Sequence, residues 1–488
     1  MLAASSFAVA CSTSDTTPAV DAGADVDLRP PTPAEWDRSV TRPSDGDATS
    51  GRTACQFKAG AMPAETLGAS SPVDKDIPID TVVVLMMENH SFDNYFGRYA
   101  KFAGRTDIES PPDDATNPTK TGATPGPLVP YAHAERLCHV DVNHGWDGTH
   151  LEWDDGTMDG FVEANEGHGK GSPAAQKDPA LASGARAMTY YDERELPFYY
   201  GLAKTFAIAD HYHSATLGPT WPNRMFLAAG TSFGLTFNGF PDISLYTFPD
   251  KDATILDELE KRHVSWNIYG DAVPGIGVIY NIAFLSRWQR TVKKAYAEFL
   301  TDAAAGALPQ FTFLDPRLTD TGPEKNDEHP PANIQYGQRF TREVVEALMK
   351  SPQWAHTALF ITWDEHGGYY DHVAPPPACA PDGTPPQLEP GDATVGKFDR
   401  YGVRVPFILV SPYAKPGYVG HAVYDHTSVL RFVQTKFKVP ALTARDANAD
   451  PMLDMFDFSS PKLLDPPPLP DATIDATQAA YCKATFNP

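Results

Sequence analysis

The sequence predicts an α/β protein, built as an α/β/α sandwich around a mostly parallel sheet in a single large domain. Continuous apolar runs recur between residues 81 and 411, which is typical of strands buried on both faces of a sheet. Amphipathic helical patterns lie between these runs. With 488 residues, of which 42% are hydrophobic, the chain is long enough to bury a sizeable core.

Four apolar runs are expected to form strands of this sheet. They are TVVVLMM at 81–87, FTFLD at 311–315, ALFITWDE at 358–365 and VPFILVS at 405–411. Each run is continuously apolar rather than alternating, so we expect parallel strands that are covered by helices on both sides.

Two segments between and after these strands have helical periodicity. Residues 337–350 and residues 425–437 each place apolar side chains on one stripe of a helix. In the second segment, Asp425 or Thr427 is available as the N-cap.

The composition divides the chain into three parts. Residues 1–75 read as a leader followed by a disordered tether, because they are rich in Pro, Ser, Thr, Asp and Ala with little periodicity. Residues 76–465 are expected to form the single large domain, and residues 466–488 a Pro-rich tail.

The first residues predict export. A short apolar segment that ends in Ala-Val-Ala precedes Cys11, and this order resembles a bacterial lipoprotein cleavage site with lipid on Cys11. The expected location is therefore the periplasm or cell surface, or the medium, with a disordered cytoplasmic leader as the alternative. The other cysteines permit two disulfides in any of three pairings. They are Cys55, Cys138, Cys379 and Cys482.

The charge balance limits the choice of partners. The formal net charge is −24, so the surface should repel nucleic acid and anionic membranes, and no nucleic-acid partner is expected. An anionic substrate must be captured locally, by a metal ion or by a few cationic side chains. No protein partner is inferred.

Three of the four apolar runs end in acids or amides. In parallel sheets, sites assemble just beyond the carboxyl ends of the strands, so these oxygens should converge. Clustered carboxylate and amide oxygens are the ligands of a hard divalent cation. The residues concerned are Glu88, Asn89, Asp315, Asp364 and Glu365. A solvated loop acid or a helix cap is the ordinary alternative for any one of them.

A threonine and several histidines stand in distinctive segments. Thr220, in GPTWPNR, lies between prolines that stiffen the backbone on both sides, and a nearby metal could activate its hydroxyl. Histidines in polar loops are candidates for proton transfer, above all His144 and His329. Taken singly, each of these residues is more often structural.

Together, these segments resemble the bacterial phosphoesterase family that contains phospholipases C and related acid phosphatases, within the alkaline-phosphatase-like superfamily. The resemblance runs from about Ile77 to Phe458. Its most specific segments are VVVLMMENHSFDNYFG at 82–97 and the stretch at 188–231, and NDEHPP and WDEHGGYYDHV extend it.

The resemblance implies a metal-dependent phosphoric ester hydrolase that works through a threonine nucleophile and a phospho-enzyme. It implies Thr220 as the nucleophile, with His144 and His329 near the phosphate. It implies one divalent ion, with Ca²⁺ favoured and Mg²⁺, Mn²⁺ or Zn²⁺ as alternatives. The implied ligands are Glu88, Asn89, Asp364, Glu365 and Thr220 itself, and the second-tier candidates are Asp315, His366, His372 and His426.

Several functions compete with this interpretation. The chain ends soon after the expected core, which favours an acid-phosphatase-like enzyme acting on small esters, with a phospholipase C acting on phosphatidylcholine-type lipids as the alternative. A non-catalytic metal-binding surface lipoprotein is a third reading. We find no sulfatase-type Cys/Ser-x-Pro-x-Arg motif, and glycosidase chemistry by Glu88 and Glu365 would leave Asn89 and the histidines unexplained.

Overall fold

The computed structural model describes residues 34–238, 254–270, 293–318 and 322–486. Cys11 and the expected leader lie outside the described residues. No helix of the described part is long and apolar enough to cross a membrane.

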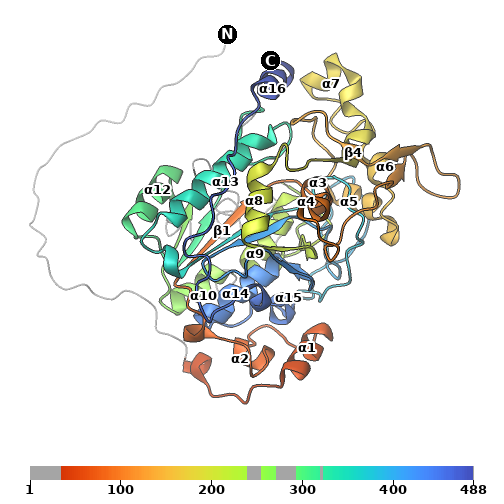
Figure 1. The fold of residues 1–488 in the computed structure, drawn as a ribbon. Coiled ribbons are helices and arrows are strands. Elements are labelled where there is room, and N and C mark those ends of the chain that lie inside the picture. The colour runs from red at the N-terminus through yellow and green to blue at the C-terminus, as the bar shows by residue number, and fades with distance from the viewer. Residues whose placement is uncertain (1–33, 239–253, 271–292, 319–321, 487–488) are drawn as a thin grey trace, which may run out of the picture.

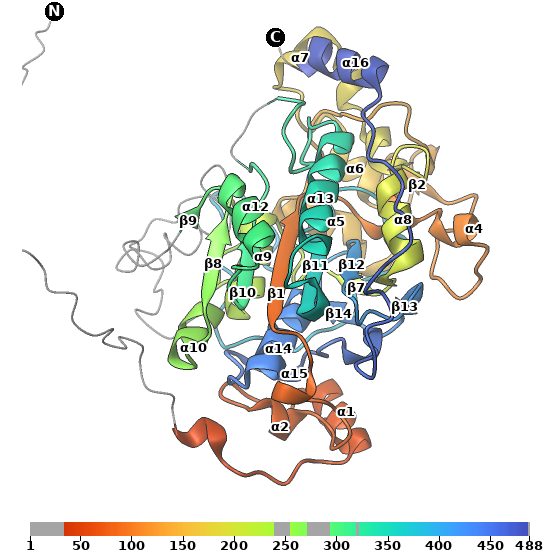
Figure 2. The same cartoon turned by 60° about the vertical axis from the view of Figure 1, so that its left-hand side comes forward.

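An eight-stranded sheet forms the centre of the molecule (Figures 1 and 2). β1 lies between β10 and β11 and is parallel to both. Along the sheet, the strands are β13 (Tyr418–Gly420), β6 (Ala207–Ala209), β12 (Phe407–Val410), β11 (Thr357–Trp363), β1 (Thr81–Met87), β10 (Phe311–Leu314), β8 (Trp266–Tyr269) and β9 (Lys293–Lys294).

All four predicted strands are present, and the mostly parallel α/β architecture is confirmed. One direction differs from the expectation, because β12 is antiparallel to both β11 and β6. β12 is fully buried, so its apolar run is continuous whichever way it points, and periodicity does not report strand direction.

Helices cover both faces of the sheet (Figures 1 and 2). One layer holds α8 (Pro197–Thr205), α12 (Tyr296–Ala305) and α13 (Ile334–Met349). The other holds α9 (Thr220–Ala229), α10 (Ile255–Lys261) and α14 (His426–Phe437). Both predicted helices are confirmed as α13 and α14, and Asp425 is the N-cap of α14.

The other described helices are α1 (Asp45–Thr53), α2 (Pro63–Thr66), α3 (Phe92–Phe96), α4 (Tyr99–Ala103), α5 (Trp146–Trp153), α6 (Phe161–Asn165), α7 (Pro173–Lys177), α15 (Ala444–Asn448) and α16 (Ala476–Phe486). The 3-10 helices are η1 (Ala34–Asp37), η2 (Asp74–Asp76), η3 (Asp154–Gly156), η4 (Pro179–Ala182), η5 (Gly184–Met188), η7 (Trp354–His356) and η8 (Leu453–Met455). Two-stranded pairs are made by β14 (Tyr424–Asp425) with β7 (Tyr212–His213), β2 (Thr116–Pro118) with β3 (Leu128–Pro130), and β4 (Ala132–His133) with β5 (Thr189–Tyr190).

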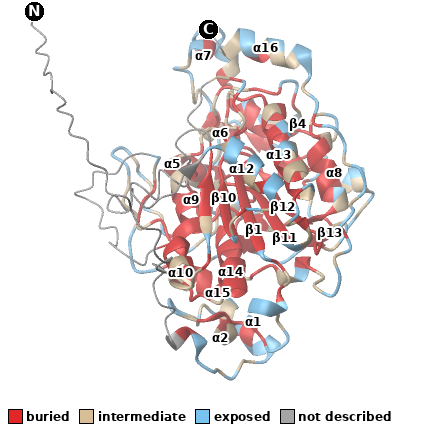
Figure 3. Cartoon of the chain, turned by 90° about the vertical axis from the view of Figure 1, so that its left-hand side faces the viewer, coloured by how far each residue is buried: buried red, intermediate tan, exposed pale blue. Residues whose placement is uncertain are grey.

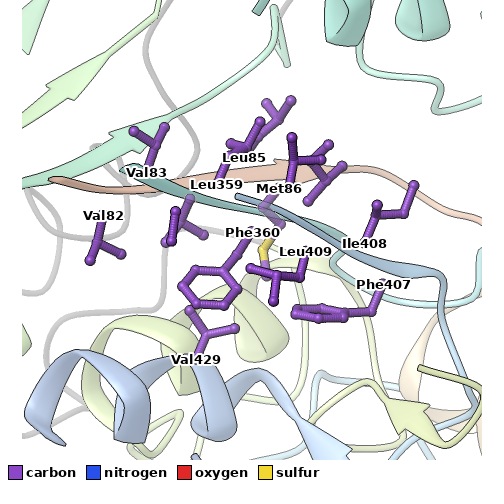
Figure 4. Close-up of a cluster of buried hydrophobic side chains, with 14 of the residues drawn as sticks. Val82, Val83, Leu85, Met86, Leu359, Phe360, Phe407, Ile408, Leu409 and Val429 are labelled. Atoms are coloured by element: carbon purple, nitrogen blue, oxygen red, sulfur yellow. The ribbon is translucent and has the colours of Figure 1, made fainter. Parts of the chain in front are cut away.

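The core surrounds the central strands, which are buried along their whole length (Figure 3). Side chains alternate between the two faces: Val82 and Phe360 point toward Val429 of α14, and Val83 points to the opposite side (Figure 4). Phe360 is fully buried, and its burial contributes about 1.5–3 kcal/mol to the free energy of folding.

Two disulfides connect segments that are far apart in the sequence. Cys55 pairs with Cys379, and Cys138 with Cys482. Residues 34–75 are consequently more ordered than the expected tether, since α1 and α2 pack on α15. The Pro-rich tail likewise carries a helix, α16, which contains Cys482.

Candidate active site

The ends of the three central strands bring polar side chains together at one edge of the sheet. β1 and β11 end in register, β10 ends two residues earlier beside Leu85, and the residues that follow the three strands converge. The backbone N–H of Asn89 donates to Asp364 Oδ1 at 3.3 Å, which joins the ends of β1 and β11. The predicted oxygen-bearing residues are all buried here: Glu88, Asn89, Asp315, Asp364 and Glu365.

Arg224, which the sequence analysis missed, lies among these carboxylates. Its Nε donates to Asp364 Oδ2 at 3.0 Å and its Nη1 to Asp315 Oδ1 at 3.1 Å, and its Nη2 is 3.6 Å from Glu88 Oε1. Nη2 also donates to two backbone carbonyls at the end of β1. The segment GPTWPNR contained the signal, because Arg224 follows Thr220 by four residues and a helix places such residues on one face.

Buried polar atoms at this edge have no partner within the described part of the chain. They are both side-chain atoms of Asn89 and the Oε1 atom of Glu365. The other oxygen of Glu365 accepts from the N–H of Gly367 at 2.7 Å. A Cβ at Gly367 would lie 2.2 Å from the carbonyl oxygen of Asn89, so only glycine permits this close approach. Unpartnered buried oxygens are costly, and a bound cation would satisfy them.

The electrostatics of the site also favour a cation. Burial, together with the nearby Asp327 carboxylate, raises the pKa of Glu88 to about 7. Burial raises the pKa of Asp364 to about 6, although Arg224 opposes the shift. Burial and the charge of Asp364 raise the pKa of Glu365 well above its usual range. Burial and mutual repulsion thus disfavour the charged forms of these carboxylates, and a divalent cation among them would offset both effects, so the residues fit a hard divalent ion.

Thr220 is the first residue of α9 and is buried. The turn before it is fixed by Asn223, whose Nδ2 donates to the carbonyls of Gly218 and Pro219 and whose Oδ1 accepts from the N–H of Thr216. Thr220 thus lies at the helix N-terminus, where backbone N–H groups favour an anion, one turn before the arginine that contacts the strand-end carboxylates.

His144 and His329 lie side by side, with their ring centroids 5.4 Å apart. The Nδ1 atom of His144 is 2.7 Å from the Val142 carbonyl, and that of His329 is 2.5 Å from the Pro330 carbonyl. These contacts leave the Nε2 atom of each ring for other partners. Burial lowers the pKa of His329.

Three charged residues near these histidines were also missed. Asp141 Oδ1 lies within 4 Å of both rings. Asp141, His144 and His329 therefore bring one possible ligand atom each close enough together to hold a metal ion. Lys325 Nζ is 3.1 Å from Asp327 Oδ2, and the Asp327 carbonyl accepts from the N–H of Glu88 at 2.9 Å. In NDEHPP, only the histidine had been singled out.

The second-tier residues have different positions. Asp315 belongs to the site through Arg224. His426 Nε2 is 2.7 Å from the Asp364 carbonyl, and burial lowers its pKa to about 4. His366 Nε2 is 2.7 Å from Glu152 Oε2, behind Glu365.

His372 lies in a separate cluster. Its Nδ1 is 2.7 Å from Asp93 Oδ2, and Arg404 Nη2 donates to Asp93 Oδ1 at 2.8 Å. This contact holds the segment after β1 to the segment before β12.

A pocket of about 300 Å³ adjoins His144 and the residue before Thr220. His144 and Pro219 form part of its wall, and Trp146 and Phe237 add aromatic surface. No lysine or arginine is among the described residues that line it. Its carboxylates come from Asp141, Asp147, Glu389 and Asp392.

Comparison with known proteins gives a consistent result. The model of the Phosphoesterase family matches residues 79–440. Non-specific phospholipase C1 of Arabidopsis thaliana is 31% identical over 86% of this chain and 79% of its own length. Phospholipase C A of Mycobacterium tuberculosis is 30% identical over 78% of each chain. Non-hemolytic phospholipase C of Pseudomonas aeruginosa is 31% identical over 83% of this chain, which spans 61% of that protein.

Solved structures resemble the chain more distantly. A protein of the alkaline phosphatase superfamily from Vibrio parahaemolyticus aligns with a TM-score of 0.33 and 11% identity, over 80% of this chain and 93% of its own.

Proposed function

Because the chain belongs to the Phosphoesterase family and is a hydrolase of phosphoric esters, we propose that Thr220 is its nucleophile and that the reaction depends on a divalent cation. The observation that carries this proposal is the set of unpartnered buried atoms of Asn89 and Glu365 beside two further carboxylates. The non-catalytic reading is set aside, because the family is one of hydrolases.

The proposed cation ligands are Glu88, Asn89, Asp364, Glu365 and the hydroxyl of Thr220. When bound, such a cation would neutralise charge on the phosphate and lower the pKa of the Thr220 hydroxyl. Arg224 holds Asp364 and Asp315 in position and keeps their charges paired.

In the proposed reaction, bond formation and proton transfer are carried out by Thr220 and by His144 or His329. Thr220 gives its hydroxyl proton to His144 or His329, and its Oγ1 forms a bond to phosphorus as the bond to the leaving alcohol breaks, which gives a phosphothreonine and an alkoxide. His144 or His329 donates a proton to the departing oxygen. Water then attacks phosphorus as the bond to Thr220 Oγ1 breaks; the proton that the water loses returns to the Thr220 oxygen, and the phosphate product departs. The N-terminus of α9 supports the anionic centre in both steps.

For the substrate, we propose phosphate esters of the acid-phosphatase kind, with phospholipase C activity as the second candidate. The three relatives named above are all phospholipases C, which favours the second candidate. The pocket beside His144 is lined by carboxylates, and we call it the acidic pocket. It favours substrates whose alcohol group is neutral or cationic, because an anionic alcohol group would be repelled.

The experiment compares kcat/KM for p-nitrophenyl phosphate with that for a monomeric, short-chain phosphatidylcholine, each with and without chelator. A ratio below about one hundredth, or roughly 2.7 kcal/mol of preference for the lipid, establishes phospholipase C activity. A higher ratio supports the phosphatase. Full activity after complete removal of divalent ions would contradict the metal dependence.

We further propose that the protein is exported and carries lipid on Cys11, outside the described residues. The two disulfides support export, since such bonds persist in oxidising compartments.

A further inference from the structure

A buried carboxyl group holds the loop that carries His329. This group belongs to Glu328, whose side chain is fully buried. Its Oε1 accepts from the Tyr199 hydroxyl at 2.6 Å, and its Oε2 accepts from the Tyr95 hydroxyl and from Trp363 Nε1, each at 2.8 Å. The three donors come from α8, α3 and the end of β11, so one side chain connects the loop to three elements of the core.

The neighbours of Glu328 belong to the candidate active site. The carbonyl of Asp327 accepts from the N–H of Glu88 at 2.9 Å, and its Oδ1 accepts from the N–H of His329 at 3.1 Å. Trp363 is the last residue of β11, directly before the proposed cation ligands that follow this strand. Glu328 therefore lies between the ends of β1 and β11 on one side and a candidate proton-transfer group on the other.

The backbone of Glu328 is held as well. His90 follows the proposed ligand Asn89, and its Nε2 is 3.3 Å from the Glu328 carbonyl. The His90 ring stacks on the rings of Tyr95 and Tyr369, with ring centroids 4.2 Å and 5.0 Å away. Glu328 is thus fixed through both its side chain and its main chain.

The fold accepts an unfavourable arrangement to place this side chain. A Cβ at Gly337 of α13 would lie 2.2 Å from Glu328 Cγ, so only glycine leaves room for it. The φ of Glu328 is 77°, in the left-handed region that residues other than glycine rarely adopt. A strained backbone that carries a buried polar group persists only where the surrounding contacts determine it, and such positions cluster at functional sites.

The contacts of Glu328 exclude a direct chemical role. Both carboxyl oxygens are occupied by the donors named above, and the residue is not among those that line the acidic pocket. Burial raises the pKa of Glu328 to about 8, although the three donors oppose the shift. At neutral pH the group is therefore largely uncharged, and it contributes directional hydrogen bonds rather than a charge that acts on the substrate.

We propose that Glu328 is a positioning residue, which holds His329 at a fixed distance from the proposed ligands that follow β1 and β11. The inference rests on the proposed function, in which His144 or His329 transfers protons, and it assigns such a transfer to His329. A proton passes only between atoms within hydrogen-bond reach, so a displacement of about 1 Å can cost on the order of 10²-fold in rate.

The test compares Glu328→Ala with Glu328→Gln on p-nitrophenyl phosphate or on a short-chain phosphatidylcholine, whichever the parent hydrolyses faster. Circular dichroism and urea unfolding establish that each variant is folded under the assay conditions. Glu328→Ala should lower kcat by on the order of 10²-fold, while KM stays within about threefold. Glu328→Gln should stay within about fivefold of the parent, because its amide oxygen can accept two hydrogen bonds and its nitrogen can donate to a tyrosine hydroxyl.

A double-mutant cycle with His329→Ala separates positioning from stability. In that background, Glu328→Ala should lower kcat by less than about threefold, because the residue that it positions is already removed. The matched control is Asp446→Ala, which removes another buried carboxyl group that accepts several hydrogen bonds. Asp446 adjoins Gly230 at the C-terminal end of α9, roughly 15 Å along the helix from Thr220, so its loss should lower stability and leave kcat unchanged.

A folded Glu328→Ala variant with the parent kcat would overturn the inference, as would an equally large loss in the His329→Ala background. If Glu328→Ala does not fold, Tyr199→Phe takes its place in the cycle, because it removes only one of the donors. A loss of about threefold or more that disappears in the His329→Ala background is then expected, and an unchanged kcat would refute the positioning role. Failure of the proposed function would instead be seen as turnover that survives Thr220→Ala.

Discussion

Arg224 Nε lies 3.0 Å from Asp364 Oδ2, and neither side chain is exposed to solvent. The contact ties the helix that begins with Thr220 to the end of β11. A buried ion pair of this kind fixes two elements relative to each other, and removing one partner leaves the other charge uncompensated.

Arg224→Met should therefore destabilise the protein by about 3–5 kcal/mol and abolish most turnover. Urea unfolding measures the first effect. The control is Arg342→Met, which removes a partly exposed pair with Glu346 and should cost less than about 1 kcal/mol. Equal stabilities of the two variants would contradict the assigned role of Arg224.

Thr220→Ala should reduce kcat by on the order of 10³-fold or more, while Thr220→Ser should keep measurable activity because the hydroxyl remains. Thr301→Ala, at an exposed position of α12, serves as the control. Mass spectrometry after a rapid acid quench should detect a phosphorylated peptide containing Thr220. If Thr220→Ala retained the parent kcat, water rather than Thr220 would be the nucleophile.

The purified protein should bind one equivalent of a hard divalent cation, and Glu365→Gln should weaken that binding by about tenfold or more. Glu346→Gln, on the exposed side of α13, should leave it unchanged. Elemental analysis and calorimetric titration provide the measurements. One equivalent of zinc held by two histidines would contradict the ligand assignment.

The stability of the protein should depend on His372. Burial lowers its pKa, but the Asp93 carboxylate at 2.7 Å outweighs this and raises the pKa of His372 to about 9. A raised histidine pKa means that the folded state binds the extra proton, so the stabilisation is full below about pH 6.5 and is lost as the pH rises through 9. The loss should be on the order of 1–3 kcal/mol, and His372→Gln should remove it. His356→Gln, at the surface, should retain the parent pH profile of unfolding.

Cys11→Ser should move the protein from the detergent phase to the aqueous phase in a partition experiment, because the lipid attachment site is lost. Activity on a soluble ester should be unchanged. Equal partitioning of parent and variant would count against lipidation of Cys11.

The sequence predicted the features that depend on local pattern. β1 and β11 were recognisable because an apolar run stops abruptly at Glu88 and Asp364, and the convergence of these residues followed from parallel pairing. Arg224 was missed because arginine is rarely buried unless it is paired, and its partners lie 91 and 140 residues away, so the helical spacing from Thr220 could place Arg224 on the same face but could not show that it pairs with carboxylates.

Other features also could not be predicted, because they depend on contacts between residues that are far apart in the sequence. β12 is fully buried, so its sequence is apolar throughout whichever way the strand runs, and its direction could not be predicted. The order of residues 34–75 depends on the partner of Cys55, and four cysteines allow three pairings.

The disulfide pairing also constrains when the protein can mature. Cys55 and Cys379 are 324 residues apart, and Cys138 and Cys482 are 344 apart, so the second cysteine of each pair is synthesised long after the first. At ordinary translation speeds of about 5–20 residues per second, the early thiols wait roughly 15–70 s for their partners. Cys55 and Cys138 could meet each other before that. A thiol–disulfide isomerase is therefore expected to raise the yield of active enzyme.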